Sequence, residues 1–308
     1  MPQLPEVGTR VSLRYRLPAG ATPPHSDVVG HLLDTGETVR VRTRHGDVVD
    51  IASTDVLAVR VVPEVPVRTS EIRNLEHAAA LAWPGTEQQW LGEWLLRFGH
   101  GITRRANSAV PLQFTSYAEI DAVARWYAAR DVPALISAPD RLLRIPEGVR
   151  TDAENLVMAT DLAEGPPVTP GLSIAATPDE AWLGVYQRDV PVDVLTAVVD
   201  GEVAFGSLDD VSVGRAAVTG APDGTRWAGI SAVHVADSAR RRGKARSLCT
   251  GLLAWARQRG ATRAYVQVVA DNAAARALYE SMGFRVHHRS RYVVAGDLLA
   301  ANPAAPPS

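Results

Sequence analysis

The sequence predicts an α/β (α+β) protein in which a mixed sheet is flanked by helices and is preceded by a small β-barrel. Short β-branched runs fill the first 63 residues, whereas strand and helix patterns alternate between residues 172 and 296. The chain has 308 residues, of which 46% are hydrophobic and 21% charged, enough for two or three domains with a sizeable core. We therefore divide it into residues 1–65, 66–170 and 171–308.

Residues 1–65 contain five short strand patterns separated by turn residues. Five strands in so few residues can bury their apolar faces only by curling into a barrel. The pattern resembles an SH3-like barrel, and Pro63 and Pro66 indicate a hinge after it. The predicted strands are Thr9–Leu17, Asp27–Asp34, Thr38–Arg44, Asp47–Ile51 and Val56–Val62.

Residues 66–170 combine helical and strand patterns but show no catalytic constellation of their own. We expect the tryptophans of this segment to belong to a core rather than to a cofactor site. A Pro- and Gly-rich linker, Glu164–Gly171, follows the segment. The predicted elements are a helix opening at Thr69 or Ser70, a strand Trp90–Phe98, a helix Ser116–Arg130, and strands Ala134–Ser137 and Leu156–Thr160.

Residues 171–308 carry the clearest alternation of strands and helices, which implies a mixed sheet covered by helices. The predicted elements are a hairpin of Val194–Val199 with Glu202–Ser207, strands Val211–Thr219 and Arg226–Val235, a helix Ala245–Arg259, a strand Arg263–Val269, a helix Asn272–Met282 and a strand Arg285–Val294.

A turn that leads from the strand Ile230–Val235 into a helix is the first candidate binding site. Such a turn directs unpaired backbone N–H groups and the positive end of the helix dipole at one spot, which suits a pyrophosphate. Gly243 has no Cβ to block a phosphate oxygen, and Ala245 is small. The alternative is a basic helix start with a solvated face. The basic residues of the turn are Arg240, Arg241, Arg242 and Lys244.

The helix that starts near residue 272 is the second candidate. Tyr279 follows Asn272 by seven residues, about two helical turns, so both side chains lie along one face. Asn272 could bond an amide of a bound ligand while the Tyr279 hydroxyl reaches the reacting group. The alternatives are an Asn that only caps the helix and a Tyr that is a half-buried core ring.

Together these residues resemble the GCN5-related N-acetyltransferase (GNAT) superfamily over about 125 residues. The motifs are Arg240-x-x-Gly243-x-Ala245, the Asn272 to Tyr279 helix, and Tyr279-Glu280-x-x-Gly283-Phe284. The front segment, with its tryptophans and Arg105-Ala106-Asn107-Ser108, and the barrel resemble an actinobacterial subgroup. Members of that subgroup carry a degenerate GNAT-like copy ahead of the working one and are often labelled N-acetylglutamate synthase.

The resemblance implies an acyltransferase with acetyl-CoA as co-substrate and no metal. The strand that ends in Val233, His234 and Val235 would separate from Tyr265–Val269 and bond the pantetheine arm, while the amides of Arg241 to Arg246 cradle the pyrophosphate. An amine would attack the thioester carbon, a backbone N–H such as that of Val235 would stabilise the oxyanion, and Tyr279 would protonate the thiolate.

The general base departs from the family pattern. One branch of the superfamily has a Glu five residues before the capping Asn, and this chain has Gln267 there. Gln cannot accept a proton. The base could be His234, or Asp209 or Asp210 through water, or the amine could arrive neutral; the alternative for His234 is a ring packed beside the sheet.

Other reactive residues give no further site. Cys249 is the only cysteine, which excludes an intramolecular disulfide and a multi-cysteine zinc site, and we expect it to be a small buried hydrophobe. His287 and His288 are adjacent on a predicted strand, so they should face opposite ways and make a poor metal pair.

Three functions follow from these patterns. The first is acetyl transfer to a primary amine of a small molecule or amino acid, with glutamate as one candidate that Arg215, Arg289 or Arg291 could hold. The second is acetylation of a protein or peptide that the barrel holds. The third is a non-catalytic CoA-sensing or nucleic-acid-binding module, which the formal net charge of −2 does not favour.

The sequence also bears on location and partners. The N-terminus has no secretory signal pattern, and no window approaches the roughly 18 apolar residues of a membrane span. We expect a cytoplasmic protein without a membrane partner. The acetyl acceptor and the oligomeric state stay open.

Overall fold

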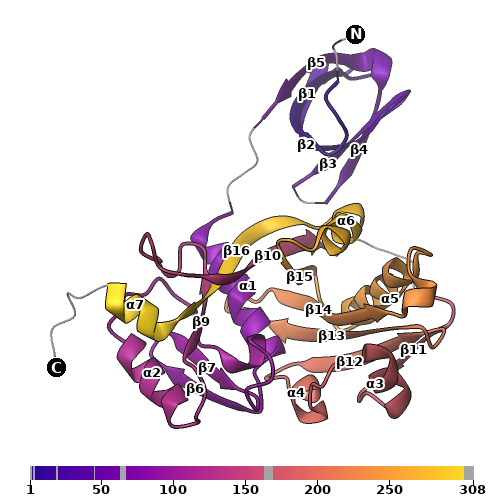
Figure 1. Ribbon diagram of the computed structural model, residues 1–308. Helices are drawn as coiled ribbons and strands as arrows, with labels where there is room; N and C mark the ends of the chain where they lie inside the picture. The colour runs from indigo at the N-terminus through magenta and orange to yellow at the C-terminus, as the bar shows by residue number, and fades with distance from the viewer. Residues whose placement is uncertain are drawn as a thin grey trace. The chain divides into compact units, whose positions relative to one another are not determined.

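The computed structural model describes residues 2, 4–18, 20–44, 46–62, 67–162 and 169–301. The chain forms two compact units, Met1–Pro66 and Val67–Ser308 (Figure 1). The predicted hinge at Pro63 and Pro66 lies outside the described residues, as does most of the predicted linker Glu164–Gly171.

The first unit is a five-stranded antiparallel sheet in the order β4-β3-β2-β1-β5, as expected for a small β-domain. Its core is made of aliphatic side chains from alternate positions, and Val11, Leu13, Leu32, Val39 and Val41 have no exposed surface. The strands are β1 (Arg10–Arg16), β2 (His25–Thr35), β3 (Thr38–Thr43), β4 (Val48–Ala52) and β5 (Val56–Val61), with a 3-10 turn η1 (Ser53–Asp55).

The second unit is built on an eight-stranded mixed sheet in the order β11-β12-β13-β14-β15-β10-β16-β9. Every neighbouring pair that the structure describes in this sheet is antiparallel, except that β14 and β15 are parallel. The strands are β9 (Leu135–Pro139), β10 (Asp152–Asp161), β11 (Leu172–Ala175), β12 (Glu202–Leu208), β13 (Ser212–Gly220), β14 (Arg226–Val235), β15 (Arg263–Val269) and β16 (Arg285–Val294).

A small second sheet, β6-β7-β8, belongs to the same unit. It consists of β6 (Glu87–Leu91), β7 (Trp94–Phe98) and β8 (Val110–Pro111), with the 3-10 turn η2 (Arg105–Asn107) between the last two. The single strand expected over Trp90–Phe98 is therefore wrong: Gly92, at φ +53°, turns the chain back into a hairpin. Trp94 is in the core as expected, whereas Trp90 is half exposed.

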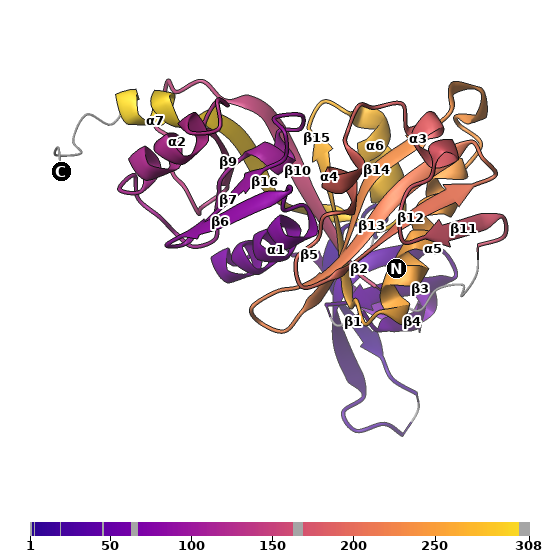
Figure 2. The ribbon, with the colours of Figure 1, turned by 90° about the horizontal axis from the view of Figure 1, so that it is seen from below.

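Helices cover both faces of the large sheet (Figures 1 and 2). One face packs on α5 through Leu248 and Leu252, and the opposite face packs on α3 and α4 through Trp182, Tyr186 and Leu195. The helices are α1 (Thr69–Ala82), α2 (Ile120–Ala128), α3 (Glu180–Tyr186), α4 (Val192–Thr196), α5 (Lys244–Gln258), α6 (Ala273–Ser281) and α7 (Ala295–Ala301), with a 3-10 turn η3 (Asp237–Ala239).

The hairpin expected over Val194–Val199 and Glu202–Ser207 is also wrong. Val194 lies in α4, which begins after Pro191, and β12 pairs with β11 and β13 instead. A run of six apolar or β-branched residues suits a buried strand and a short buried helix equally well, and here the packing of Val194 and Leu195 under the sheet selects the helix.

The sheet crosses the expected boundary at residue 170. β9 and β10 come from residues 66–170, yet β10 lies between β15 and β16, which come from the following segment (Figure 2). Strands from both predicted segments thus belong to the large sheet, and the interpretation of residues 66–170 as a degenerate copy of the fold stays a prediction.

Candidate active site

The two parallel strands of the large sheet separate toward their carboxyl ends. β14 and β15 are paired from Trp227 with Arg263 to Ile230 with Val266, and neither strand is paired with the other beyond that point. β14 nevertheless continues for five residues, to Val235, and β15 for three, to Val269. This separation leaves backbone groups on the inner side of each strand available to a ligand that enters between them.

A β-bulge in β14 accompanies the separation. His234 is opposite Val213 and Ser231 is opposite Arg215, so two residues of β14 face the single residue Gly214. The extra residue is Ala232, which has a φ of +52°. A non-glycine residue in this region is strained and is found most often at functional sites, where a bulge redirects the strand.

The bulge also decides where the next side chains point. Val233 contacts the α5 core, so His234 faces the opposite side of the sheet. Partial burial lowers the pKa of His234, and the positive charges of Arg240 and Arg188 lower it further, against an opposing effect of Asp237. His234 is therefore neutral at pH 7 and able to accept a proton.

The loop that leads into α5 has free amide groups. The amide of Ser247 donates to Gly243 O at 3.0 Å, and the amides of residues 241–246 have no acceptor among the described residues. Gly243 has a φ of +77°, and a Cβ built on it would meet no atom within 4 Å. The loop is therefore an open cluster of donors at a helix N-terminus, the arrangement that suits a phosphate.

Only some of the basic side chains of this loop are free to meet an anion. Arg241 and Arg242 are exposed and have no partner among the described residues. The others are paired with protein groups. These pairs are Lys244 Nζ with Asp209 Oδ2 at 2.5 Å, Arg240 with Asp237 at 2.7 Å, and Arg246 Nη2 with Ser281 O at 3.1 Å.

Asn272 caps α6. Its Oδ1 accepts from the amide of Ala275 at 3.0 Å, so the oxygen of this side chain has the capping role. The side chain is exposed, and its Nδ2 donates to no described residue. Ala245, in the first turn of α5, is half-buried.

Tyr279 lies deeper than the sequence suggests. Its ring is 7% exposed and packs against Phe284 at 5.6 Å between centroids. Its hydroxyl is hydrogen-bonded to the Cys249 thiol, and burial together with this thiol raises the pKa of Tyr279 well above its usual value. Burial raises the pKa of Cys249 to about 12, so Cys249 is the inert buried residue that we expected.

A small pocket, partly open to solvent, lies where β14 and β15 separate. Ser231 and Gln267 line it at the split, Tyr265 lies beside them, and Trp83, Arg105 and Arg215 come from α1, η2 and β13. Ser231 Oγ, Trp83 Nε1 and Arg105 Nε are buried and have no hydrogen-bond partner among the residues that the structure describes. The pocket thus concentrates polar groups that a ligand could satisfy.

Arg215 forms the fully buried part of the pocket wall. It is 1% exposed, and its guanidinium lies 4.5 Å from the Trp83 ring centroid. It donates to three main-chain carbonyls, at 2.6 Å to Leu195 O, 2.8 Å to Ala82 O and 2.9 Å to Ala197 O. Burial lowers the pKa of Arg215 to about 9, and the charge of Arg105 contributes.

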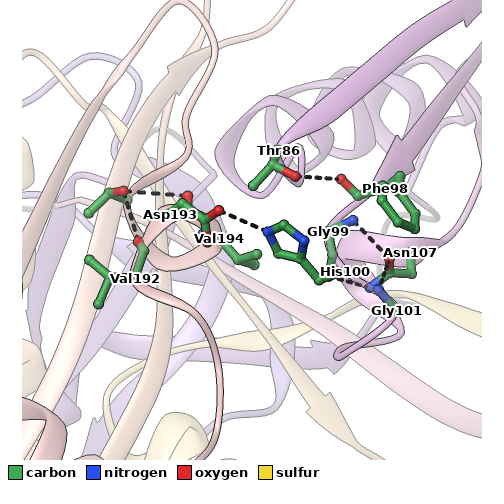
Figure 3. Close-up of polar contacts among 10 residues, drawn as sticks. Thr86, Phe98, Gly99, His100, Gly101, Asn107, Val192, Asp193 and Val194 are labelled. Carbon is green, nitrogen blue, oxygen red and sulfur yellow. Dashed lines mark hydrogen bonds and ion pairs between the residues drawn. The ribbon is translucent and has the colours of Figure 1, made fainter.

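Asn107, two residues after Arg105, holds the loop Gly99 to Gly101 in place (Figure 3). Asn107 Oδ1 accepts from the amides of Gly99 and Gly101, both at 2.8 Å, and its Nδ2 donates to Gly99 O at 3.1 Å. His100, between the two glycines, reaches across to Asp193 of α4 at 2.8 Å. Within the signature Arg105 to Ser108, Arg105 lines the pocket, and Asn107 orders the neighbouring loop.

Other candidates lie away from the pocket. The arginines proposed for an acceptor carboxylate, Arg289 and Arg291, both pair with Glu154. Asp209 is paired with Lys244. Among the described residues, no cluster of three or more His, Cys, Asp or Glu could hold a metal ion.

The expectation that His287 and His288 face opposite ways is wrong. Their Nδ1 atoms are 2.8 Å apart because the register between β10 and β16 shifts at this point, which breaks the alternation. His288 Nε2 also contacts Glu76 Oε1 at 2.7 Å. The group is buried beneath the sheet and does not line the pocket.

The architecture is that of an N-acetyltransferase of the GNAT class. A solved GCN5-related N-acetyltransferase from Kribbella flavida has the same fold, with a TM-score of 0.50, 17% identity, and coverage of 74% of this chain and 96% of that chain.

The chain belongs to the family described as "Probable histone acetyltransferase Rv0428c C-terminal", whose profile matches residues 69–293. A protein of Mycobacterium tuberculosis named "Probable histone acetyltransferase Rv0428c" is 48% identical over 293 residues, 94% of this chain and 96% of its own. A Bacillus subtilis protein named "Uncharacterized N-acetyltransferase YobR" is 24% identical over 246 residues, 70% of this chain and 94% of its own. The protein is therefore an acyltransferase.

The N-terminal unit is corrected by the same comparison. Residues 5–60 match a profile described as "Rv0428c N-terminal Sm-like domain", so the domain is Sm-like and not SH3-like. Both descriptions fit five short antiparallel strands, and turn spacing alone does not separate them. The label N-acetylglutamate synthase is not supported by any of these relatives.

No helix among the described residues combines the length and the hydropathy that crossing a membrane would take.

Sequence reasoning missed two parts of the pocket, Trp83 and Ser231. Each is one residue in an ordinary helix end or strand, and its importance appears only when four separate elements meet. Arg215 was considered as a carboxylate ligand, and Arg105 was noted only as part of a signature. The signal in the sequence that pointed toward this pocket was the tryptophan and arginine content of the front segment.

Proposed function

We propose that this acyltransferase moves the acetyl group of acetyl-CoA to the primary amine of a small molecule or amino acid. One observation carries the proposal: the parallel strands β14 and β15 separate between a loop of free amides and a pocket of unpartnered polar groups. The loop suits the pyrophosphate, and the split suits an extended pantetheine arm that bonds the backbone of Val233 to Val235.

In the proposed transfer the amine attacks the thioester directly, and the protein forms no covalent bond to the acetyl group. The amine nitrogen bonds to the thioester carbon, the carbon–sulfur bond breaks, and the thiolate takes a proton. In this proposal the amides of Arg241 to Arg246 hold the phosphates, and Arg241 and Arg242 add charge. Asn272 Nδ2 is available to the same ligand because only the oxygen of its side chain is used in capping.

We assign the proton-accepting role to His234 and the proton-donating role to Tyr279. The lowered pKa of His234 keeps it neutral at pH 7, as a base requires, and the raised pKa of Tyr279 keeps it protonated, as an acid requires. The Tyr279 hydroxyl lies beside the Cys249 thiol in this structure, so it must turn from that sulfur toward the departing thiolate.

A protein acceptor is the second candidate, and the 48% identical relative named as a probable histone acetyltransferase supports it. In that case the N-terminal unit could hold the partner. One assay separates the candidates: release of free thiol from acetyl-CoA with separate panels of amines, amino acids, histone proteins and lysine peptides. Intact mass spectrometry would identify the acetylated product.

The result expected is thiol release with at least one small amine, together with CoA binding by calorimetry. Acetylation confined to the protein panel would support the second candidate. If CoA binds to the folded protein with no measurable affinity, both proposals fail.

A further inference from the structure

The pocket where β14 and β15 separate contains positive charge that no carboxylate balances. Arg105 and Arg215 both line it, and the described residues of its wall include no Asp or Glu. Among the described residues, the Arg215 side chain bonds only main-chain carbonyl oxygens. The Arg105 side chain has no hydrogen bond or ion pair there, and its guanidinium lies 5.4 Å from the Trp83 ring centroid.

This arrangement contrasts with the other arginines of the same unit. Partly buried residues such as Arg263 and Arg130 pair with an exposed carboxylate, Asp161 and Glu87 respectively. Exposed pairs of that kind contribute little to stability, whereas a buried guanidinium without a counter-ion is costly. Arg215 is among the most buried charged groups and is left without one. Because burial disfavours the charged guanidinium, it also lowers the pKa of Arg215.

The remaining polar groups of the pocket also favour an anion. Trp83 Nε1 and Arg105 Nε can only donate hydrogen bonds, and both are buried without an acceptor. Ser231 Oγ, also without a partner, can donate as well. A carboxylate offers two oxygens with about four acceptor sites, which matches a wall made of donors.

The position of the pocket ties this anion to the acetyl acceptor. Ser231 is the last residue before the bulge at Ala232, and Gln267 is the first residue of β15 beyond its pairing with β14. A group held here lies at the split where the thioester would enter. A lysine side chain would bring a second cation and no carboxylate to the same place, so it fits the charge of the pocket poorly.

We propose that the pocket binds the carboxylate of the acetyl acceptor through Arg105 and Arg215, so that the preferred acceptor is an amine that carries a carboxylate, such as an amino acid. This inference rests on the proposed function for the amine. It goes further in naming the chemical class of the acceptor and the residues that select it.

The test compares acceptors that differ only in the carboxylate. Each set contains an α-amino acid, its carboxamide and the amine that remains without the carboxyl group, assayed by thiol release with the full-length protein. We expect at least a tenfold higher kcat/KM for the best amino acid than for its carboxamide. Arg105→Gln should remove most of that preference by raising KM for the amino acid alone.

A matched control and a binding measurement keep the test independent of folding and of turnover. Arg104→Gln removes the same charge at the neighbouring residue, whose side chain is exposed and paired with Asp152 at 2.5 Å, and should leave the preference unchanged. Calorimetry with the N-acetylated amino acid measures the pocket without any reaction. Arg105→Gln should weaken that binding at least tenfold while CoA affinity and the melting temperature stay unchanged.

The outcomes separate this inference from the proposed function. Thiol release at equal kcat/KM for all members of a set, or a preference for lysine peptides, would overturn the inference and leave acetyl transfer standing. Binding of the N-acetylated amino acid that depends on Arg105, without thiol release from any amine, would support the pocket and overturn the proposed function.

Discussion

Replacing Gly243 with alanine tests whether the loop before α5 holds the phosphates of the co-substrate. Gly243 has a φ of +77° and is the N-cap residue of α5. A Cβ at this position would meet no protein atom within 4 Å, so the substitution causes no clash inside the protein. The new methyl group would instead occupy space beside the free amides, where a phosphate oxygen must approach closely.

Two magnitudes follow from this geometry. An alanine in the left-handed region costs roughly 1–2 kcal/mol of stability, because its Cβ approaches the following carbonyl. If the methyl group keeps a phosphate oxygen from one amide, a hydrogen bond to a charged group is lost, which is about 1.5–3 kcal/mol. That loss would weaken CoA binding roughly 10- to 150-fold.

Gly224 provides the matched control. It has a φ of +83°, lies in the turn between β13 and β14, and also has no atom within 4 Å of an added Cβ. Both Gly243→Ala and Gly224→Ala should lower the free energy of unfolding by a similar amount in urea, but only Gly243→Ala should weaken CoA binding in calorimetry. Equal CoA affinity in the wild type and both variants would refute the role of the loop.

Three further predictions concern other parts of the unit. Tyr279→Phe removes the hydroxyl that lies beside the Cys249 thiol, and steady-state kinetics should show a lower kcat with a smaller change in KM for acetyl-CoA. Burial lowers the pKa of His287 to about 3, so the unfolded chain takes up a proton below pH 6.5 that the folded chain does not. The free energy of unfolding should therefore fall with decreasing pH between 6.5 and 3, by about 1.4 kcal/mol per unit from this group, and His287→Gln should lose that part of the slope in urea titrations. Lys244, the only lysine, pairs with Asp209 beside the loop, and CoA should slow its modification by an amine-directed reagent, as read by peptide mass.

Each of these predictions has a contradicting result. An unchanged kcat in Tyr279→Phe would show that another group protonates the thiolate or that this step is not rate-limiting. The same pH slope in the wild type and His287→Gln would show that His287 does not carry it. Equal labelling of Lys244 with and without CoA would place the phosphates elsewhere; the α-amino group serves as the internal control.

The carboxyl-terminal half of the fold could be predicted closely because local signals agree there. The bounds of β15 and β16 coincide with the ranges expected from the sequence, Arg263–Val269 and Arg285–Val294. Both strands are rich in β-branched residues, and turn or helix-capping residues flank them. The apolar residues of α5 also recur with a clear helical period, and its core residues Leu248 and Leu252 are fully buried.

The errors arise where tertiary contacts decide between local alternatives. The run at Val194 is apolar enough for a strand, and only its packing beneath the sheet makes it helical. The strand that holds His287 and His288 should alternate, but a register shift against β10 brings the two rings together. Neither feature has a signal in the local sequence.

The candidate site divides in the same way. The loop around Gly243 and the capping Asn272 follow from short motifs, because neighbouring residues build them. The pocket does not, because Trp83, Arg105 and Ser231 come from three elements that meet only when the sheet has formed. The burial of Tyr279 could not be predicted either, because Cys249, which lies beside it, is on another helix.

The place of β10 limits how this chain can be divided. Its backbone is hydrogen-bonded on one side to β15 and on the other to β16. A fragment that started at residue 171 would expose two open strand edges in the middle of its sheet, and such edges invite pairing with other chains. Expression of the presumed catalytic half by itself should therefore give aggregated material, and a working fragment has to begin before α1, near residue 67.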